Sequence, residues 1–353
     1  MSTFSENAHP RVVVAGVGCR SAVGTNLPVS ASSIRAGISR SEMHPFLVDK
    51  EGQSMIVTRA TYLCDSLQGW ERLIQLGEPA AEEAWSKAPK TMRKTDLVLA
   101  LPQPREGLSE GEINRIRNHF ESLPWCAGLT LIHGGNASGI QALEYGWRHI
   151  RELHLTHCMI GAMDSHLDMW RLEQLDYQGL LRTHSRPHGV NPGEGAGFCL
   201  LVNPETFPEW ETAYEVKSVS ISTESNLKPG DVNLGEGFSV GLQGLLGRLE
   251  SKTLIGRVFC DLNSQIYRVD EYGLATARFS DYFESHSILT TPADCWGDVG
   301  AASGIMFTGL AIQTSELDGM HGLDLIWTGS DDGVRGLALC GASPKGRAHA
   351  SHH

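Results

Sequence analysis

Apolar residues along this chain follow two alternating patterns. Short, almost continuous apolar runs bounded by Gly, Pro or polar residues are typical of buried β-strands. Stretches in which apolar residues recur every three or four positions are typical of amphipathic helices. The first pattern occupies residues 11–18, 96–101, 127–132, 156–165 and 198–202, and the second occupies residues 28–37, 67–88, 106–123 and 140–150. This alternation predicts a mixed α/β fold.

The second half of the chain repeats the first. The segment Asn136-Ala-Ser-Gly-Ile140 recurs as Ala301-Ala-Ser-Gly-Ile305, 165 residues later. Strand-like runs recur around it in the same order: 96–101 with 256–262, 158–164 with 325–331, and 197–201 with 336–340. We therefore predict a duplicated β/α unit, with halves over residues 1–207 and 208–342 and a frayed tail over residues 343–353.

Charge and cysteine content narrow the classes of function. With 41 Asp and Glu against 29 Lys and Arg, the net charge of −12 disfavours nucleic acid and anionic membranes as partners. The start of the chain lacks the layout of a signal peptide, and no apolar run reaches the length of a spanning helix, so we expect a cytoplasmic protein.

The eight cysteines are scattered singly, which predicts buried thiols rather than a metal cluster. The spacing of Gly16, Gly18 and Gly24 differs from the Gly-x-Gly-x-x-Gly fingerprint of dinucleotide-binding sites, so these glycines predict a tight turn instead. No cofactor or metal is expected.

One stretch combines a strand, a Gly-rich turn and a helix start. The apolar run 127–132 leads into His133-Gly-Gly-Asn136, and the helical pattern begins at Ile140. A side chain presented there lies at the positive end of a helix, where a Cys thiolate would be stabilised. The residue in that position is Asn136, and an amide nitrogen is not a nucleophile.

Two segments resemble β-ketoacyl synthases, which have the thiolase-like fold. Asn136-Ala-Ser-Gly139 stands where that family has Cys-Ala-Ser-Gly, and Ser185-Arg-Pro is followed by Pro192-Gly-Glu-Gly-Ala-Gly197. The resemblance implies duplicated βαβαβαββ halves in a five-layered α-β-α-β-α arrangement.

The same resemblance implies that the catalytic site has been lost. In the family, a Cys accepts an acyl group and two His side chains hydrogen-bond the carbonyl of the second thioester. The nearest match to the first His is Asn263. The second His belongs to a Gly-His-x-x-Gly-Ala-Ala-Gly segment, matched here by residues 296–304, and Gly297 is taken to replace it. The family's Lys falls near Pro292. With Asn136, four positions lack the chemistry of the family.

Two rearranged sites would keep catalysis. Ser138 or His133 near the turn, with Asp298 or Glu271 opposite, would form a new site, although Ser and Asp early in a helix are more often caps. Cys295 would be a displaced nucleophile, although a buried spectator thiol is the commoner case.

Several other polar and aromatic residues have structural interpretations. Tyr267, Tyr272 and Trp296 are candidates to fill the old pocket. Glu194 is expected to accept structural hydrogen bonds, and Asp164 and Asp331 are expected to satisfy backbone donors at equivalent strand ends. The run Arg268, Asp270 and Glu271 predicts a solvated face or an ion-pair network.

These observations favour a binding or accessory subunit over an enzyme. We expect a homodimer, or a heterodimer with another thiolase-fold subunit, paired through the sheet edge formed by the strand before Asn136. An acyl chain, a carrier domain or another protein would be the partner, and a chain-length-factor-like role is one variant. The alternative is an acyltransferase or 3-oxoacyl synthase with a rearranged site. Residues 261–273 and 292–300 resemble thiolase-like proteins found beside bacterial type VI secretion cargo, which implies an adaptor role.

Overall fold

The computed structural model describes residues 9–153, 155–183, 185–210, 214–225, 233–249, 253–318 and 322–342. The predicted tail over residues 343–353 lies outside these ranges. The first half forms β1 (Val13–Ser21), α1 (Leu27–Arg35), β2 (Ser41–Val48), β3 (Ser54–Thr58), α2 (Gly69–Trp85), β4 (Thr95–Leu101), α3 (Glu110–Glu121), β5 (Cys126–His133), α4 (Ser138–Glu152), β6 (His157–Ser165), α5 (Met169–Tyr177) and β7 (Glu194–Val202). The second half forms β8 (Tyr214–Thr223), α6 (Glu236–Leu246), β9 (Ile255–Cys260), α7 (Ile266–Arg278), β10 (Phe283–Thr290), α8 (Ala293–Trp296), α9 (Ser303–Asp318), β11 (Leu323–Gly329) and β12 (Val334–Ala342).

The sheet topology confirms the duplication. The strand order is β10-β9-β11-β12-β8-β1-β7-β6-β4-β5. Without the separate β2–β3 hairpin, each half contributes five strands, β1 and β4–β7 or β8–β12. If these are numbered 1 to 5 along the chain, both halves have the order 3-2-4-5-1. The two sets meet at β1 and β8, where Val13 pairs with Glu215. β5 and β10 are therefore equivalent strands at the two outer edges of the sheet.

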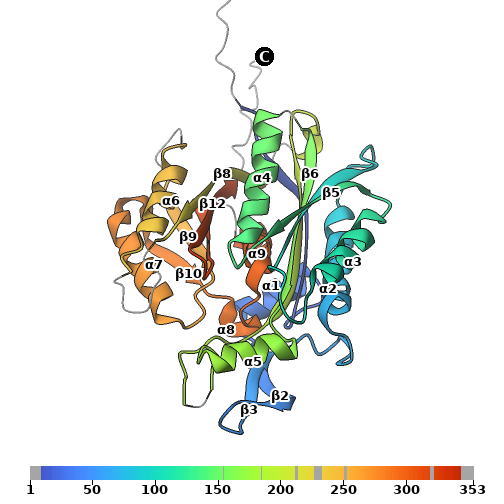
Figure 1. The fold of residues 1–353 in the computed structure, drawn as a ribbon. Helices are drawn as coiled ribbons and strands as arrows, with labels where there is room; N and C mark the ends of the chain where they lie inside the picture. The colour runs from blue at the N-terminus through green and yellow to red at the C-terminus, as the bar shows by residue number, and fades with distance from the viewer. Residues whose placement is uncertain are drawn as a thin grey trace, which may run out of the picture.

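The helices form layers on and between the two halves (Figure 1). α2 and α3 cover the outer face of the first half, and α6 and α7 cover that of the second. α4 and α9 lie between the halves, where α4 contacts β6 and β8 and α9 contacts β7 and β11. This arrangement confirms the predicted five-layered thiolase-like fold.

The repeated Ala-Ser-Gly segments meet at the centre of the molecule. A side-chain carbon at Gly139 would lie 2.9 Å from the Ala301 carbonyl oxygen, and one at Gly304 would lie 2.7 Å from Ile140 side-chain carbons. Only glycine permits so close an approach of the two helix starts. The repeat is therefore a packing requirement of the duplicated fold. The central core around these helices includes Leu143, Trp147, Ile305, Phe307 and Leu310.

Some elements were not predicted from the sequence. β2 and β3 pair as a separate antiparallel hairpin, and β2, which contains Pro45, has only exposed and half-buried residues. Apolar periodicity cannot reveal such a strand, because neither face is buried. α7 likewise occupies a stretch interpreted as a polar segment with a charge run. No helix in the described ranges is long and apolar enough to cross a bilayer.

Candidate functional site

The predicted strand, turn and helix are present around Asn136. β5 ends at His133 and α4 begins at Ser138. Ala137 is the N-cap residue of α4 and supplies no side-chain cap, and its backbone N–H donates to Ser330 Oγ at 2.9 Å. Asn136 is 7% exposed. Its side chain is therefore held inside the protein, just before the helix.

The side chains of Asn136 and Asn263 converge on one carboxylate. Asn136 Nδ2 donates to Asp298 Oδ1 at 2.9 Å, and Asn263 Nδ2 donates to Asp298 Oδ2 at 2.7 Å. The backbone N–H of Gly300 also donates to Oδ1 at 2.9 Å. Asn136 comes from the first half of the chain and the other residues from the second, so this cluster joins the two halves.

His166 completes the surroundings of Asp298. Its Nε2 lies 3.7 Å from Asp298 Oδ1, and its Nδ1 accepts a hydrogen bond from Arg171 Nε at 3.5 Å. Burial disfavours ionisation of Asp298, but the nearby His166, the charge of Arg268 and the hydrogen bond from Asn263 hold the pKa of Asp298 well below its ordinary range. The centre of this site is therefore a permanent anion.

The sequence interpretation assigned the second His position to Gly297, and the structure corrects this. Gly297 has φ 77°, and a side-chain carbon there would lie 2.9 Å from Gly193 Cα. No side chain fits, because residue 297 packs against the backbone of the preceding loop. Asp298 faces Asn136 instead. It also has the spacing of the family motif, since it lies six residues before Gly304.

The space beside this cluster is small. A cavity of about 20 Å³ is lined by Asn136, His166, Arg171, Leu175, Leu180, Val190, Asn263, Gln265, Asp298 and Asp331. A single water molecule needs about 10–15 Å³ measured this way. The site has room for about one water and none for an acyl chain.

The proposed rearranged catalytic groups are not assembled. His133 Nδ1 hydrogen-bonds the Pro102 carbonyl oxygen at 3.1 Å, and Ser138 Oγ donates to the Gly135 carbonyl at 2.7 Å. Among the described residues, no hydroxyl or thiol hydrogen-bonds His166. Neither Ser138 nor His133 contacts Asp298 through a hydrogen bond in these ranges.

Cys295 and Trp296 lie in the short helix α8. Burial and the charge of Asp294 raise the pKa of the Cys295 thiol, which disfavours the reactive thiolate. Trp296 is fully buried and stacks on Phe307 with ring centroids 6.3 Å apart. Neither residue lines the small cavity.

The charge run in α7 is an ion-pair network, and most of it is buried rather than solvated. Arg268 Nη1 donates to Asp261 at 3.0 Å, and its Nη2 donates to Asp331 at 3.1 Å. Glu271 accepts two hydrogen bonds from the buried Arg335, at 2.6 and 3.0 Å. Asp270 alone in this run is exposed.

Three further predictions concern groups around this network. Tyr267 donates to Asp331 at 2.9 Å, and Tyr272 packs against Trp327, so neither fills the small cavity. Asp331 thus accepts from side chains, and its predicted backbone role is not seen in the described residues. Asp164 does accept from backbone N–H groups, those of Ser165 at 2.8 Å and Ala301 at 3.0 Å.

Glu194 has the structural role expected of it. It is fully buried and accepts two hydrogen bonds from Arg72, at 2.6 and 2.7 Å. The Ala60 backbone N–H and Ser165 Oγ complete its partners at 2.7 and 3.2 Å. The Gly-Glu-Gly motif therefore ties β7 to α2 and to the end of β6.

His166 and Arg171 were missed by the sequence reasoning. His166 immediately follows β6, whose last residues are Asp164 and Ser165. Polar residues after the carboxyl end of a buried strand commonly reach a site in α/β folds. That position was the available signal, but it does not say that His166 turns toward Asp298.

Solved structures with the same fold are ketosynthases and their relatives. One is described as a type II polyketide acyl-carrier protein in complex with its ketosynthase bound to the hexaketide (AntDE:AntF); its TM-score is 0.76 at 14% identity, over 95% of this chain and 100% of that one. A second is the ishigamide ketosynthase/chain length factor, with a TM-score of 0.75 at 16% identity, over 95% and 99% of the two chains. A third is the ketosynthase from module 6 of the bacillaene synthase of Bacillus subtilis 168, with a TM-score of 0.76 at 10% identity, over 96% and 73%. No family model matches the sequence, and no curated protein matches it in sequence.

Proposed function

We propose that this chain, which has the thiolase-like fold of ketosynthases, is a non-catalytic subunit that acts by binding. The main observation behind this proposal is that the carboxylate of Asp298 fills the space between Asn136 and Asn263. The side chains at the positions matching the family's Cys and one of its His residues, Asn136 and Asn263, both donate to the carboxylate of Asp298. The Asp298 carboxylate therefore occupies the two amide donors that would otherwise be available to hydrogen-bond a substrate.

Electrostatics argue against condensation chemistry at this place. Stabilising a developing oxyanion requires hydrogen-bond donors aimed at the position where its charge appears. Asp298 is ionised, fully surrounded by its own donors, and only 7% exposed. A second negative charge beside it would be repelled, and the cavity of about 20 Å³ leaves no room for a thioester.

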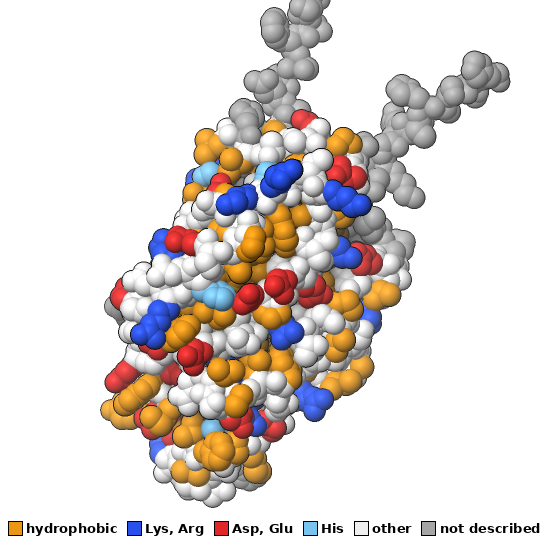
Figure 2. Space-filling view, turned by 90° about the vertical axis from the view of Figure 1, so that its right-hand side faces the viewer, with side chains coloured by type: hydrophobic (Ala, Val, Ile, Leu, Met, Phe, Trp, Pro, Cys, Tyr) orange, Lys and Arg blue, Asp and Glu red, His pale blue; other side chains and the backbone are white. Residues whose placement is uncertain are grey.

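The edge strand β5 supports a thiolase-fold partner. β5 pairs with β4 on one side only, so its other edge carries unpaired backbone groups. Leu129, Leu131 and Ile132 on this strand are half-buried against the two flanking cores. Figure 2 shows the molecule from this side: hydrophobic side chains gather in the upper middle, with Lys and Arg above them and Asp and Glu below. Such a strand fits pairing with a second copy or with another thiolase-fold subunit.

Two finer variants of the proposal have different support. A chain-length-factor-like role is supported by the fold likeness to a ketosynthase/chain length factor structure. The type VI secretion association depends only on the resemblance of residues 261–273 and 292–300, and it stays a prediction.

Intact-protein mass spectrometry tests the loss of catalysis. We expect no covalent adduct after incubation with acetyl, hexanoyl and malonyl thioesters, under conditions in which an active ketosynthase is fully acylated. Asn136→Ala is the matched variant and should behave like the wild type. An acyl adduct on Ser138 or on any Cys, or turnover of malonyl thioester that disappears in Asn136→Ala, would contradict the proposal.

A further inference from the structure

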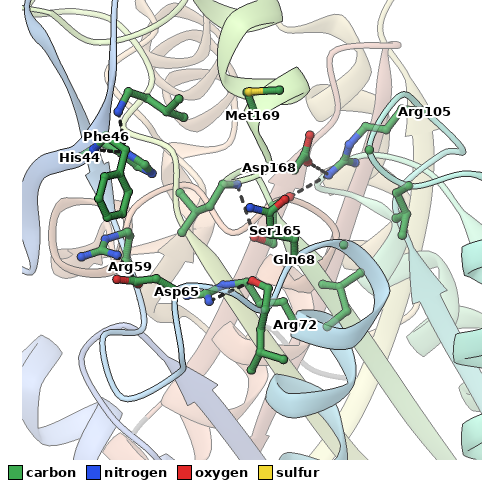
Figure 3. A pocket seen from close by; sticks show the side chains of 17 residues that line it. His44, Phe46, Arg59, Asp65, Gln68, Arg72, Arg105, Ser165, Asp168 and Met169 are labelled. Atoms are coloured by element: carbon green, nitrogen blue, oxygen red, sulfur yellow. Dashed lines mark hydrogen bonds and ion pairs between the residues drawn. The ribbon is translucent and has the colours of Figure 1, made fainter.

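A second and larger cavity lies apart from the Asp298 cluster. It has a volume of about 170 Å³ and lies between the β2–β3 hairpin, the start of α2, the loop after β4 and the loop after β6 (Figure 3). Ser165 lines this cavity, while its neighbour His166 lines the small one. The two spaces are therefore on opposite sides of one loop, and the proposed loss of catalysis does not account for the larger one.

The walls of the cavity are largely apolar. Leu73 and Leu108 are buried behind it, Leu167 is half-buried, and Phe46 and Met169 are exposed at its mouth. An engineered apolar cavity of about 150 Å³ accepts benzene. The space thus fits one aromatic ring or a short branched chain, and it excludes a nucleotide or a coenzyme A thioester.

Several hydrogen-bond donors line this space, and the first of them is His44. Burial and the charge of Arg59 lower the pKa of His44, which is therefore neutral at neutral pH. His44 Nδ1 accepts from the backbone N–H groups of Phe46 and Leu47 at 3.2 and 3.0 Å. The proton of this neutral ring is then on Nε2, which is a donor without a partner among the described residues.

Two arginines and a helix start add to these donors. Arg59 uses Nε for Glu42 and Nη1 for Asp65, at 2.7 and 2.5 Å, and its Nη2 has no partner in the described ranges. Arg105 Nη2 donates to the Ser165 carbonyl at 2.7 Å and to Asp164 Oδ1 at 3.2 Å, and its buried Nε has no partner among the described residues. α2 begins beside the cavity, where Gln68 and Gly69 line it, and has no side-chain cap. The first N–H groups of a helix lack partners within the helix and carry its positive dipole end.

The carboxylates of the lining are already occupied. Asp65 accepts from Arg59, and Asp168 accepts from the Arg171 backbone N–H at 2.8 Å and lies 3.6 Å from Arg105. The third arginine, Arg72, is saturated by Glu194. Each of the three lining arginines is ion-paired: Arg59 with Glu42 and Asp65, Arg72 with Glu194, and Arg105 with Asp164 and Asp168. The side-chain donors left without a partner among the described residues are His44 Nε2, Arg59 Nη2 and Arg105 Nε.

We propose that this cavity binds a small monocarboxylate with an apolar body, of the size of an aryl or short branched-chain acid. The apolar part lies against Leu73, Leu108 and Leu167. The carboxylate faces His44, Arg59 and the start of α2. This site is independent of the proposed loss of catalysis and of the β5 edge.

Titration calorimetry with three ligands of one shape tests the charge preference. Benzoate, benzyl alcohol and benzylamine differ in the polar end alone. We expect benzoate to bind at least ten-fold more tightly than benzyl alcohol, as charge-assisted hydrogen bonds imply, and benzylamine not to bind. Equal or tighter binding of benzyl alcohol or benzylamine, or no binding of benzoate at 10 mM, would overturn the proposal.

Variants then place the ligand in this cavity. Leu167→Trp fills the space and should abolish benzoate binding, and Arg59→Gln should weaken it about ten-fold. Leu153→Trp adds the same ring at an exposed position at the end of α4 and should leave binding unchanged. Circular dichroism checks that each variant is folded. Wild-type affinity in a folded Leu167→Trp, or in a folded Arg59→Gln, would overturn the assignment.

Discussion

At the scale of single residues, the carboxylate of Asp298 is the centre of the polar cluster around Asn136. Three hydrogen-bond donors surround it, the two side-chain amides and the Gly300 backbone N–H, and His166 Nε2 lies 3.7 Å away. In the low dielectric of the interior, a carboxylate with these partners is stable, whereas each donor left without it would be buried and unpaired. It thus links Asn136 of the first half to Asn263 and Gly300 of the second.

Replacing this carboxylate should be costly. We expect Asp298→Ala to lower the free energy of unfolding by about 3–5 kcal/mol, because it removes one partner of a buried charged cluster. Urea denaturation followed by tryptophan fluorescence measures this. Asp331→Ala is the matched control, since the Asp331 side chain is 60% exposed and exposed ion pairs contribute little. Equal losses in the two variants would contradict the assigned role.

The low pKa of Asp298 predicts the direction of the acid response. A carboxyl group whose folded pKa is depressed stabilises the native state above its ordinary pKa of about 4, and the stabilisation is lost as pH falls toward the folded value. Asp261 acts in the opposite sense, because burial raises its pKa to about 6 and its contribution is lost as pH rises through that value. Comparing the wild type with Asp298→Asn isolates the first group. We expect stability to fall more steeply below pH 4 in the wild type, and parallel curves would contradict this.

At the scale of elements, the two outer strands of the sheet are topologically equivalent but chemically different. β5 carries Leu129, Leu131 and Ile132, half-buried against cores on both faces. β10 is mostly exposed along its length. The edge of β5 is thus the better candidate for pairing with another chain.

A charge placed on each edge strand tests that difference. We expect Thr130→Lys on β5 to weaken self-association at least ten-fold in sedimentation velocity, because like charges would face each other across the paired strands. Ile288→Lys on β10 is the matched control and should leave association unchanged. A wild-type protein that is monomeric at all concentrations would contradict a homodimer.

At the scale of the whole molecule, the halves meet through the β1–β8 pairing and the packing of α4 and α9, and a group of hydrogen bonds between them lies at the duplicated helix starts. The Ala137 N–H meets Ser330, the Ala301 N–H meets Asp164, and Asn136 meets Asp298. Each contact takes one partner from each half. These hydrogen bonds thus join the two halves where α4 and α9 begin.

The sequence by itself determined the alternation of strands and helices, the duplication and the absence of a nucleophile at residue 136. These follow from local periodicity and from residue identity, which depend on neighbours close in the chain. It did not predict the β2–β3 hairpin, because β2 is largely exposed and β3 is only five residues long, or the cavity beneath it. It also placed Gly297 where Asp298 belongs.

Only the tertiary structure decided which groups meet. Asn136 and Asp298 are separated by 162 residues, and Asn263 and Asp298 by 35. Nothing in the local pattern says that two amides and His166 turn toward one carboxylate, because that depends on how the two halves pack. The depressed pKa of Asp298, the small space beside it and the donor-rich cavity at the hairpin arise in the same way, from burial and from partners that are remote in the chain.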